Sequence, residues 1–152
     1  MGLSAFDAIG TGFEGVFSRR SLNHEQKERV LYLLEQFKDE LATSRTGEVE
    51  DMSVRDIARK QFSHFSAPQQ ALLVFLRAIV ARSPLIVLDE PTQGMDEKIW
   101  EKCRVLLAKE WKEMRAQGKE QACVVVSHYE DEVPWKHGKV LRLVDGKVTH
   151  CG

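Results

Sequence analysis

The segment LIVLDE, residues 85–90, constrains the fold of this chain more than any other stretch. Its first four residues are all apolar, without the alternation of apolar and polar side chains that marks a half-exposed strand. Such a run is typical of a central strand in a parallel sheet that is covered on both faces. The segment ACVVVSH, residues 122–128, is similarly apolar and β-branched. Together the two segments predict an α/β fold built on a parallel sheet.

Helical patterns account for most of the remaining chain. Apolar residues recur near helical spacing over 23–38, where Asn23 and Gln26 have the spacing of a capping box. The sequence also predicts a loop over residues 42–51, and helices that start near residue 53, near residue 67 and over 97–115. A tight hairpin is expected at Asp145-Gly146, whereas the first sixty residues are expected to be helical only.

Composition excludes several classes of protein. Hydrophobic residues make up 43% and charged residues 30% of the chain, as in a globular domain, and the net charge of -1 gives no reason to expect nucleic acid as a partner. The longest apolar run, residues 71–81, is too short to span a bilayer. The three cysteines lack metal-ligand spacing, and no signal peptide is visible. We therefore expect reduced thiols and an intracellular, cytoplasmic location, with a mitochondrial location as the alternative.

Two carboxylates follow the first apolar strand. Successive strand side chains point to opposite faces, so Asp89 and Glu90 can serve different tasks. One could hold a hydrated Mg²⁺ ion while the other polarises an attacking water molecule. Alternatively, the acidic residues merely end the strand and cap the next helix.

A nucleotide hydrolase would also need a loop that binds phosphate. The pattern GxxxxGK[ST] occurs nowhere in the chain. The segment GTGFEG, residues 10–15, matches G-x-G-x-x-G, but a helical segment precedes it where that motif needs a strand. We therefore expect a turn there rather than a phosphate cradle.

Four motifs occur in one order: FSAPQ (65–69), LIVLDEP (85–91), QGMD (93–96) and VVVSH (124–128). Their order and spacing resemble the signature, the Walker B strand, the D-loop and the switch histidine of ABC-type ATPases. The segment VSHYEDEVP is especially similar to soluble ABC proteins of the ModF and PhrA type, and LSAFDAIGTGF resembles the stretch after the family's Q-loop.

The resemblance implies a partial P-loop NTPase of class α/β, with a RecA-like parallel sheet and an N-terminal helical subdomain. It divides the chain into a helical subdomain over residues 1–60 and the signature helix with the Walker B half of the ATPase core over 61–152. The Walker A motif and the Q-loop are then expected upstream of Met1.

The same resemblance implies roles for six residues. Asp89 would hold Mg²⁺, Glu90 would act as the catalytic base, and His128 would contact the γ-phosphate of ATP. The remaining nucleotide-binding candidates are Ser66, Gln69 and Asp96, with Ser66 acting across an interface with a second ABC nucleotide-binding domain, in a homodimer or a tandem cassette. Structural explanations exist beside these roles, because Ser66 and Gln69 have capping-box spacing, Asp96 suits a helix N-cap, and His128 could be a surface histidine.

The signature departs from the family pattern. Ala67 and Pro68 replace two glycines, and Pro68 has no N–H to donate to phosphate. Two hypotheses follow. The chain is the C-terminal part of an ATPase domain that hydrolyses ATP with Mg²⁺ once a Walker A-bearing segment completes it, or it is a degenerate, non-catalytic module for dimerisation or regulation. Glu90 and His128 favour the first hypothesis, whereas Pro68 and the missing phosphate-loop lysine favour the second.

Overall fold

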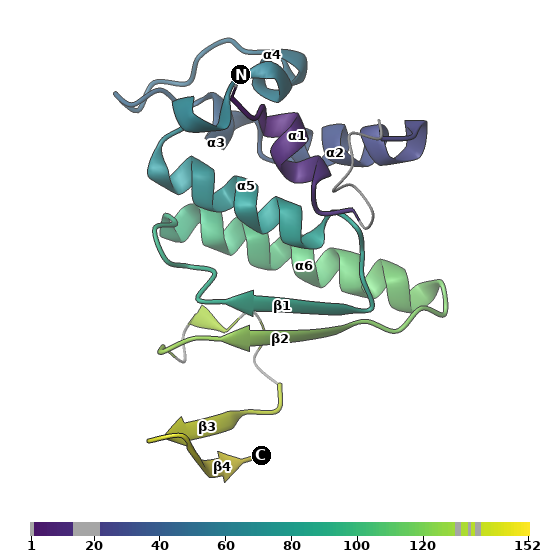
Figure 1. Cartoon of the computed structure of the whole chain (residues 1–152), viewed down its shortest axis with the longest axis vertical. Helices are drawn as coiled ribbons and strands as arrows, with labels where there is room; N and C mark the ends of the chain where they lie inside the picture. The colour runs from purple at the N-terminus through teal and green to yellow at the C-terminus, as the bar shows by residue number, and fades with distance from the viewer. Residues whose placement is uncertain (1, 14–21, 130–131, 134, 136–137) are drawn as a thin grey trace.

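A computed structural model describes residues 2–13, 22–129, 132–133, 135 and 138–152. Its elements are α1 (Ala5–Gly10), α2 (His24–Gln36), α3 (Lys38–Ala42), α4 (Val54–Arg59), the 3-10 turn η1 (Phe62–His64), α5 (Ala67–Ile79), β1 (Leu85–Asp89), α6 (Glu97–Ala116), β2 (Ala122–Val126), β3 (Leu141–Val144) and β4 (Lys147–Cys151). Helices α1–α4 form a layer on one side of α5 and α6, and strands β1 and β2 lie on the other side (Figure 1). None of the helices in the described ranges is long and apolar enough to span a membrane.

Side-chain caps start several helices where the sequence predicted them. Asn23 begins α2, Ser53 begins α4 and Ser66 begins α5. In each case the cap accepts a backbone N–H three residues ahead, and the residue there bonds back to the cap. Asp96 caps α6. The predicted helix starts are therefore confirmed.

The predicted parallel sheet is also confirmed. Strands β1 and β2 pair in parallel from Leu85 opposite Ala122 to Asp89 opposite Val126. Strands β3 and β4 form a separate antiparallel hairpin, and its turn residues Asp145 and Gly146 both have positive φ angles, 49° and 74°. These angles are those that a tight two-residue hairpin turn requires.

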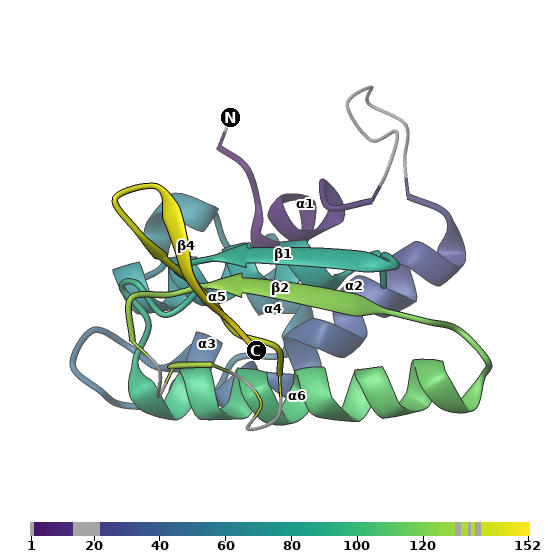
Figure 2. The same ribbon diagram turned by 90° about the horizontal axis from the view of Figure 1, so that it is seen from below.

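The parallel strands are covered on one face only. Ile86 and Leu88 are buried beneath the helices, whereas Leu85 and Val87 are 56% and 58% exposed. Seen from below, the two strands lie in front of helices α4 and α5 (Figure 2). The prediction of a strand covered on both faces was thus wrong for the described residues, because α5 and α6 pack against the same side of the sheet.

Burial also sets the state of the cysteines, all three of which are free thiols. Cys103 is buried and Cys123 half-buried, and desolvation raises the pKa of both thiols, that of Cys123 to about 11. Their protonated forms are therefore favoured at neutral pH, as expected for packing residues. Cys151 is exposed on β4.

The glycine-rich segment after α1 serves packing. A Cβ atom on Gly12 would lie 2.1 Å from the main-chain oxygen of Arg77 on α5, a distance that a real Cβ does not reach. Gly12 therefore lets the chain approach α5 closely. A helix, α1, precedes this segment, in agreement with the sequence prediction, while the last two residues of GTGFEG lie outside the described residues.

A buried ion pair joins the helical layer to the rest of the chain. The Arg29 guanidinium on α2 donates to both carboxylate oxygens of Glu110 on α6, at 2.8 Å for Nη2 and Oε2. It also donates to the carbonyl oxygens of Ile79 and Val80 at the end of α5, at 3.2 Å each. Glu110 is only 4% exposed, and Arg82 lies 3.6 Å from it. One arginine thus connects α2, α5 and α6.

Replacing Arg29 with methionine should leave the Glu110 carboxylate buried and short of its main partner. We expect the free energy of unfolding to fall by about 3–5 kcal/mol in urea titrations, the usual result of breaking a buried pair. The matched control is Arg104→Met, which removes a pair with the exposed Glu101 and should cost less than about 1 kcal/mol. Equal losses in the two variants would contradict the role given to Arg29.

Candidate functional site

Three of the predicted site residues lie where the two parallel strands end. Asp89 is the last residue of β1, Glu90 follows it, and His128 comes just after β2. Because the strands are parallel, their carboxyl ends meet at one edge of the sheet. The His128 Nε2 atom lies 2.6 Å from Glu90 Oε1. The structure therefore brings Glu90 and His128 into direct contact, with Asp89 beside them in the chain.

The backbone at Glu90 has an unusual conformation. Its φ angle is 45°, in the left-handed region that non-glycine residues rarely occupy. Its N–H donates to the Val126 carbonyl at 2.8 Å, and its own carbonyl accepts from the Gln93 N–H at 3.0 Å. These two bonds hold the turn after β1. Backbone strain of this kind is concentrated at functional sites, which favours a functional role for Glu90.

The turn that carries His128 is fastened by residues that sequence reasoning missed. The Ser127 hydroxyl donates to the Glu132 carboxylate and accepts from the Tyr129 N–H at 3.1 Å. A serine that bonds the backbone N–H two residues ahead is a common local turn, and this local signal could have been found. Several acidic residues follow His128 in the sequence, however, and only the structure identifies Glu132 as the partner of Ser127.

Asp89 is exposed at the strand end, where a cation could reach its carboxylate. Among the described residues there is no group of three or more His, Cys, Asp or Glu side chains that could hold a metal ion. Mg²⁺ needs no such cluster, because it commonly binds one or two carboxylates, substrate phosphates and water. The single carboxylate thus fits Mg²⁺ bound together with a nucleotide better than a metal held by protein alone.

Ser66 forms the start of the signature-like helix α5. Its N–H donates to Gln69 Oε1 at 2.9 Å, and its hydroxyl accepts from the Gln69 N–H at 3.5 Å. Pro68 lies in the first turn, where its missing N–H costs no intrahelical bond. The helix therefore begins as the capping pattern predicted, with fewer free backbone donors than a glycine-containing start would offer.

The Gln69 side chain faces inward. Only 5% of this residue is exposed. Its amide nitrogen donates to the carbonyl oxygens of Glu40 and Thr43 at 2.8 Å, and to that of Leu41 at 3.3 Å. These carbonyls lie at the end of α3, where a helix leaves acceptors unpaired. Gln69 thus has a structural task, which is to fix the start of α5 against α3.

Asp96 acts as a helix cap in this structure. Its Oδ1 atom accepts from the Lys98 N–H at 2.7 Å and, more weakly, from the Ile99 N–H at 3.4 Å. The side chain stays exposed, so capping does not prevent a second contact. Among the six predicted site residues, direct contacts link Glu90 with His128 and Ser66 with Gln69.

Comparison with known proteins gives the family context of this geometry. No family model matches the chain. An uncharacterized ABC transporter ATP-binding protein of Schizosaccharomyces pombe is 36% identical over 101 residues, which are 66% of this chain and 20% of that protein. An uncharacterized ABC transporter ATP-binding protein of Sinorhizobium fredii is 29% identical over 114 residues, which are 70% of this chain and 32% of that protein.

Solved structures show the same relationship at the level of the fold. The dimeric bacterial ABC transporter cassette MJ0796 is similar in fold, with a TM-score of 0.66 and 21% sequence identity. The match covers 99% of this chain and 56% of the MJ0796 chain. The same cassette bound to ADP and Pi, in a post-hydrolysis state, matches with a TM-score of 0.64 and 22% identity. The fold of this chain is therefore that of part of an ABC cassette.

The relatives and the fold together confirm the resemblance to ABC-type ATPase domains that the sequence motifs predicted. The chain spans about half the length of the solved cassettes that it matches, and less than that of its sequence relatives.

Replacing Gln69 with leucine tests how much the stability of the fold depends on the side-chain amide of this residue. The carbonyls at the end of α3 would lose their donor, so we expect the free energy of unfolding to fall by about 1–3 kcal/mol. The control is Gln93→Leu at an exposed position, which should change the free energy of unfolding by less than about 0.5 kcal/mol. Chemical denaturation measures both, and an unchanged Gln69→Leu variant would show that the amide contacts are dispensable.

Proposed function

We propose that this chain is the C-terminal part of an ABC-type ATPase domain, which binds and hydrolyses ATP once a Walker A-bearing segment completes it. Residues 1–60 would form the helical subdomain, and residues 61–152 the signature helix with the Walker B half of the core. The observation that carries the proposal is the 2.6 Å contact between Glu90 and His128 at the ends of two parallel strands. This contact occurs in a chain whose relatives are ABC transporter ATP-binding proteins.

Glu90 is proposed as the general base. Its carboxylate lies at the edge of the sheet, half-exposed, and would accept the proton of the water that attacks the γ-phosphate. His128 is largely exposed and reaches Glu90 through Nε2. With ATP bound, an imidazole in this place would orient Glu90 or donate a hydrogen bond to the γ-phosphate. The Ser127–Glu132 bond would hold His128 within reach.

Asp89 is proposed as the Mg²⁺ ligand. When bound, the ion would neutralise the negative charge that accumulates on the phosphates. The role of Asp89 is to hold and orient it from the end of β1. Asp89 lies on the exposed face of β1 and Glu90 in the turn that follows the strand, where it contacts His128, so the two carboxylates can serve different tasks.

A second ABC nucleotide-binding domain is the proposed partner. The solved MJ0796 cassette is dimeric, which supports a site shared between two copies. Ser66 would contact a phosphate bound by the partner domain from the N-terminus of α5, where the helix dipole favours an anion. Gln69 would act indirectly, by fixing this helix start, and the exposed Asp96 would lie at the same shared interface. Pro68 removes one backbone donor, so the interaction should be weaker than with glycine.

A non-catalytic module is the second candidate, and Pro68 together with the absence of GxxxxGK[ST] favours it. In that case the fold would serve dimerisation or regulation. The two candidates differ in what Glu90 does: the first requires its carboxylate for turnover, and the second does not.

The test is to join the chain to a Walker A-bearing N-terminal cassette segment and to measure ATP affinity and turnover. Glu90→Gln keeps the side-chain shape, so ATP should still bind while turnover falls by roughly 10²–10⁴-fold, the usual contribution of a positioned base. Asp89→Asn should instead weaken Mg²⁺-dependent binding. The control Glu97→Gln, at an exposed position in the first turn of α6, should alter neither. Full turnover in Glu90→Gln would remove the catalytic assignment and favour the non-catalytic module.

A further inference from the structure

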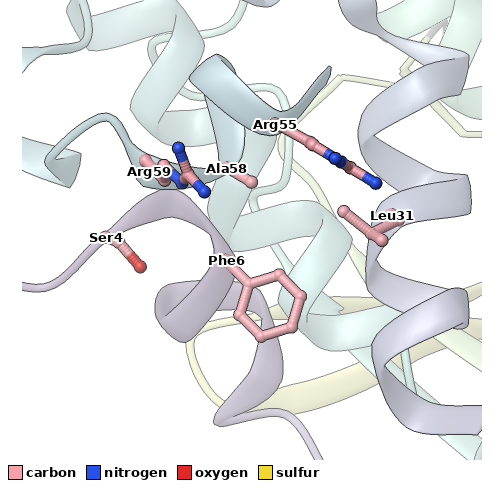
Figure 3. Close-up of a pocket in the computed structure, with 6 residues that line it drawn as sticks. All are labelled: Ser4, Phe6, Leu31, Arg55, Ala58 and Arg59. Carbon is pink, nitrogen blue, oxygen red and sulfur yellow. The ribbon is translucent and has the colours of Figure 1, made fainter. Parts of the chain in front are cut away.

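A surface pocket of about 570 Å³ lies beside the start of helix α6. Its lining comes from the turn before α6, from the first turns of that helix and from Glu132. It is a different pocket from the one between α1, α2 and α4 that Figure 3 shows. Met95 and Trp100 both line the pocket beside α6. Because Met95 is only partly buried, small molecules that enter this pocket can reach its side chain.

The indole of Trp100 has a donor without an acceptor. Its Nε1 atom is buried, and no hydrogen-bond partner for it exists among the described residues. Only 6% of the residue is exposed, so bulk water does not satisfy this N–H either. The ring packs edge to face against Phe75 on α5, with 6.0 Å between the ring centroids. A buried indole N–H usually has a partner, so this one is available to an acceptor placed beside it.

The start of α6 places Met95 next to Trp100. Asp96 is the N-cap of this helix. Met95 is therefore the residue before the cap, and Trp100 is the fourth residue of the helix. Side chains at these two positions often pack together at a helix start. A polar group added to the Met95 sulfur would consequently lie close to the Trp100 N–H.

The Met95 sulfur is the group at this helix start that an oxidant would attack. The Cys103 thiol donates to it at 3.9 Å. Cys103 is itself fully buried, and desolvation raises the pKa of its thiol, so little of the reactive thiolate forms. A thioether needs no deprotonation before it is oxidised to the sulfoxide. Peroxide in the pocket therefore reacts with Met95 rather than with Cys103.

We propose that Met95 is a site of reversible oxidation by hydroperoxides, and that the Trp100 N–H binds the sulfoxide oxygen formed there. With hydrogen peroxide, the sulfur lone pair attacks one oxygen, the O–O bond breaks and an S–O bond forms. The sulfur is oxidised by two electrons and the peroxide is reduced. The displaced hydroxide takes the proton of the transferred oxygen and leaves as water. A methionine sulfoxide reductase reverses the change.

The hydrogen bond from Trp100 would offset the cost of a polar group at this position. A thioether sulfur accepts hydrogen bonds only weakly, whereas a sulfoxide is polar. A polar group away from water is costly unless it is hydrogen-bonded. The unpartnered indole N–H is the complementary group, so one bond satisfies both atoms. The oxidised Met95 would then stay attached to the start of α6.

The test treats the folded chain with dilute hydrogen peroxide and needs no nucleotide. Peptide mapping by mass spectrometry should find one added oxygen on Met95 before it finds one on Met114, which is only 5% exposed. In proton–nitrogen NMR spectra the Trp100 indole N–H should move downfield as the sulfoxide forms, and a sulfoxide reductase should restore its position. The Trp111 indole already donates to the Gln121 carbonyl, so its resonance should stay in place.

Three variants separate the bond to Trp100 from general damage. Met95→Leu keeps the volume but removes the thioether, so peroxide should leave the Trp100 resonance unmoved. The matched control is Met52→Leu, at a half-buried methionine outside the pocket, which should keep the full response. Trp100→Phe removes the N–H but keeps an aromatic ring. Oxidation should therefore lower its melting temperature more than that of the unaltered chain.

The proposal is overturned if Met95 resists peroxide as long as Met114 does. An unmoved Trp100 resonance after Met95 has been oxidised would also overturn it, as would the same shift in Met95→Leu. Equal losses of melting temperature in Trp100→Phe and in the unaltered chain would show that the indole N–H does not bind the sulfoxide. If Trp100→Phe does not fold, the NMR comparison of the unaltered chain with Met95→Leu and Met52→Leu decides.

Discussion

The anchoring of helix α5 at both ends is the constraint on which the rest of the structure depends. At its start, the buried Gln69 amide binds carbonyl groups at the end of α3. At its end, the Arg29 guanidinium binds the carbonyls of Ile79 and Val80 while it pairs with Glu110 on α6. Each anchor supplies hydrogen bonds to buried polar groups, so breaking either is costly. The helical layer, α5 and α6 are thereby held as one unit.

This anchoring has a direct consequence for the proposed function. Strand β1 begins shortly after α5 ends, and the Glu90 turn follows β1. The proposed signature residue Ser66 and the proposed base Glu90 therefore lie at the two ends of one continuous, fixed segment of chain. A phosphate contact at the start of α5 and a reaction at the end of β1 would then depend on the same packing. Two independent loops would not link the positions of the two residues in this way.

Local sequence patterns predicted the elements well. Capping residues such as Asn23 and Ser53 determine where helices begin through contacts three residues away, and Asp145-Gly146 determines its own turn. The carboxyl ends of β1 and β2 were predictable for the same reason, because apolar runs mark the strands and parallel pairing aligns their ends. The proximity of Glu90 and His128 follows from that pairing.

Contacts between distant segments could not be read from the sequence. Arg29 and Glu110 are 81 residues apart, and nothing near either residue indicates its partner. Gln69 has the spacing of a capping box, but the sequence does not show that its amide also reaches Thr43. An apolar run shows that both faces of a strand can be buried, but not that other elements cover both faces. In the structure Leu85 and Val87 are exposed on one face of β1.

The central claim is that the chain carries the base, the metal ligand and the signature serine but lacks the loop that holds the phosphates. Calorimetry with Mg-ATP on the chain by itself tests this most directly, because the missing backbone cradle and lysine normally provide most phosphate contacts. The account predicts weak binding or none. A low-micromolar dissociation constant would contradict it, and would mean that the chain holds phosphate by itself.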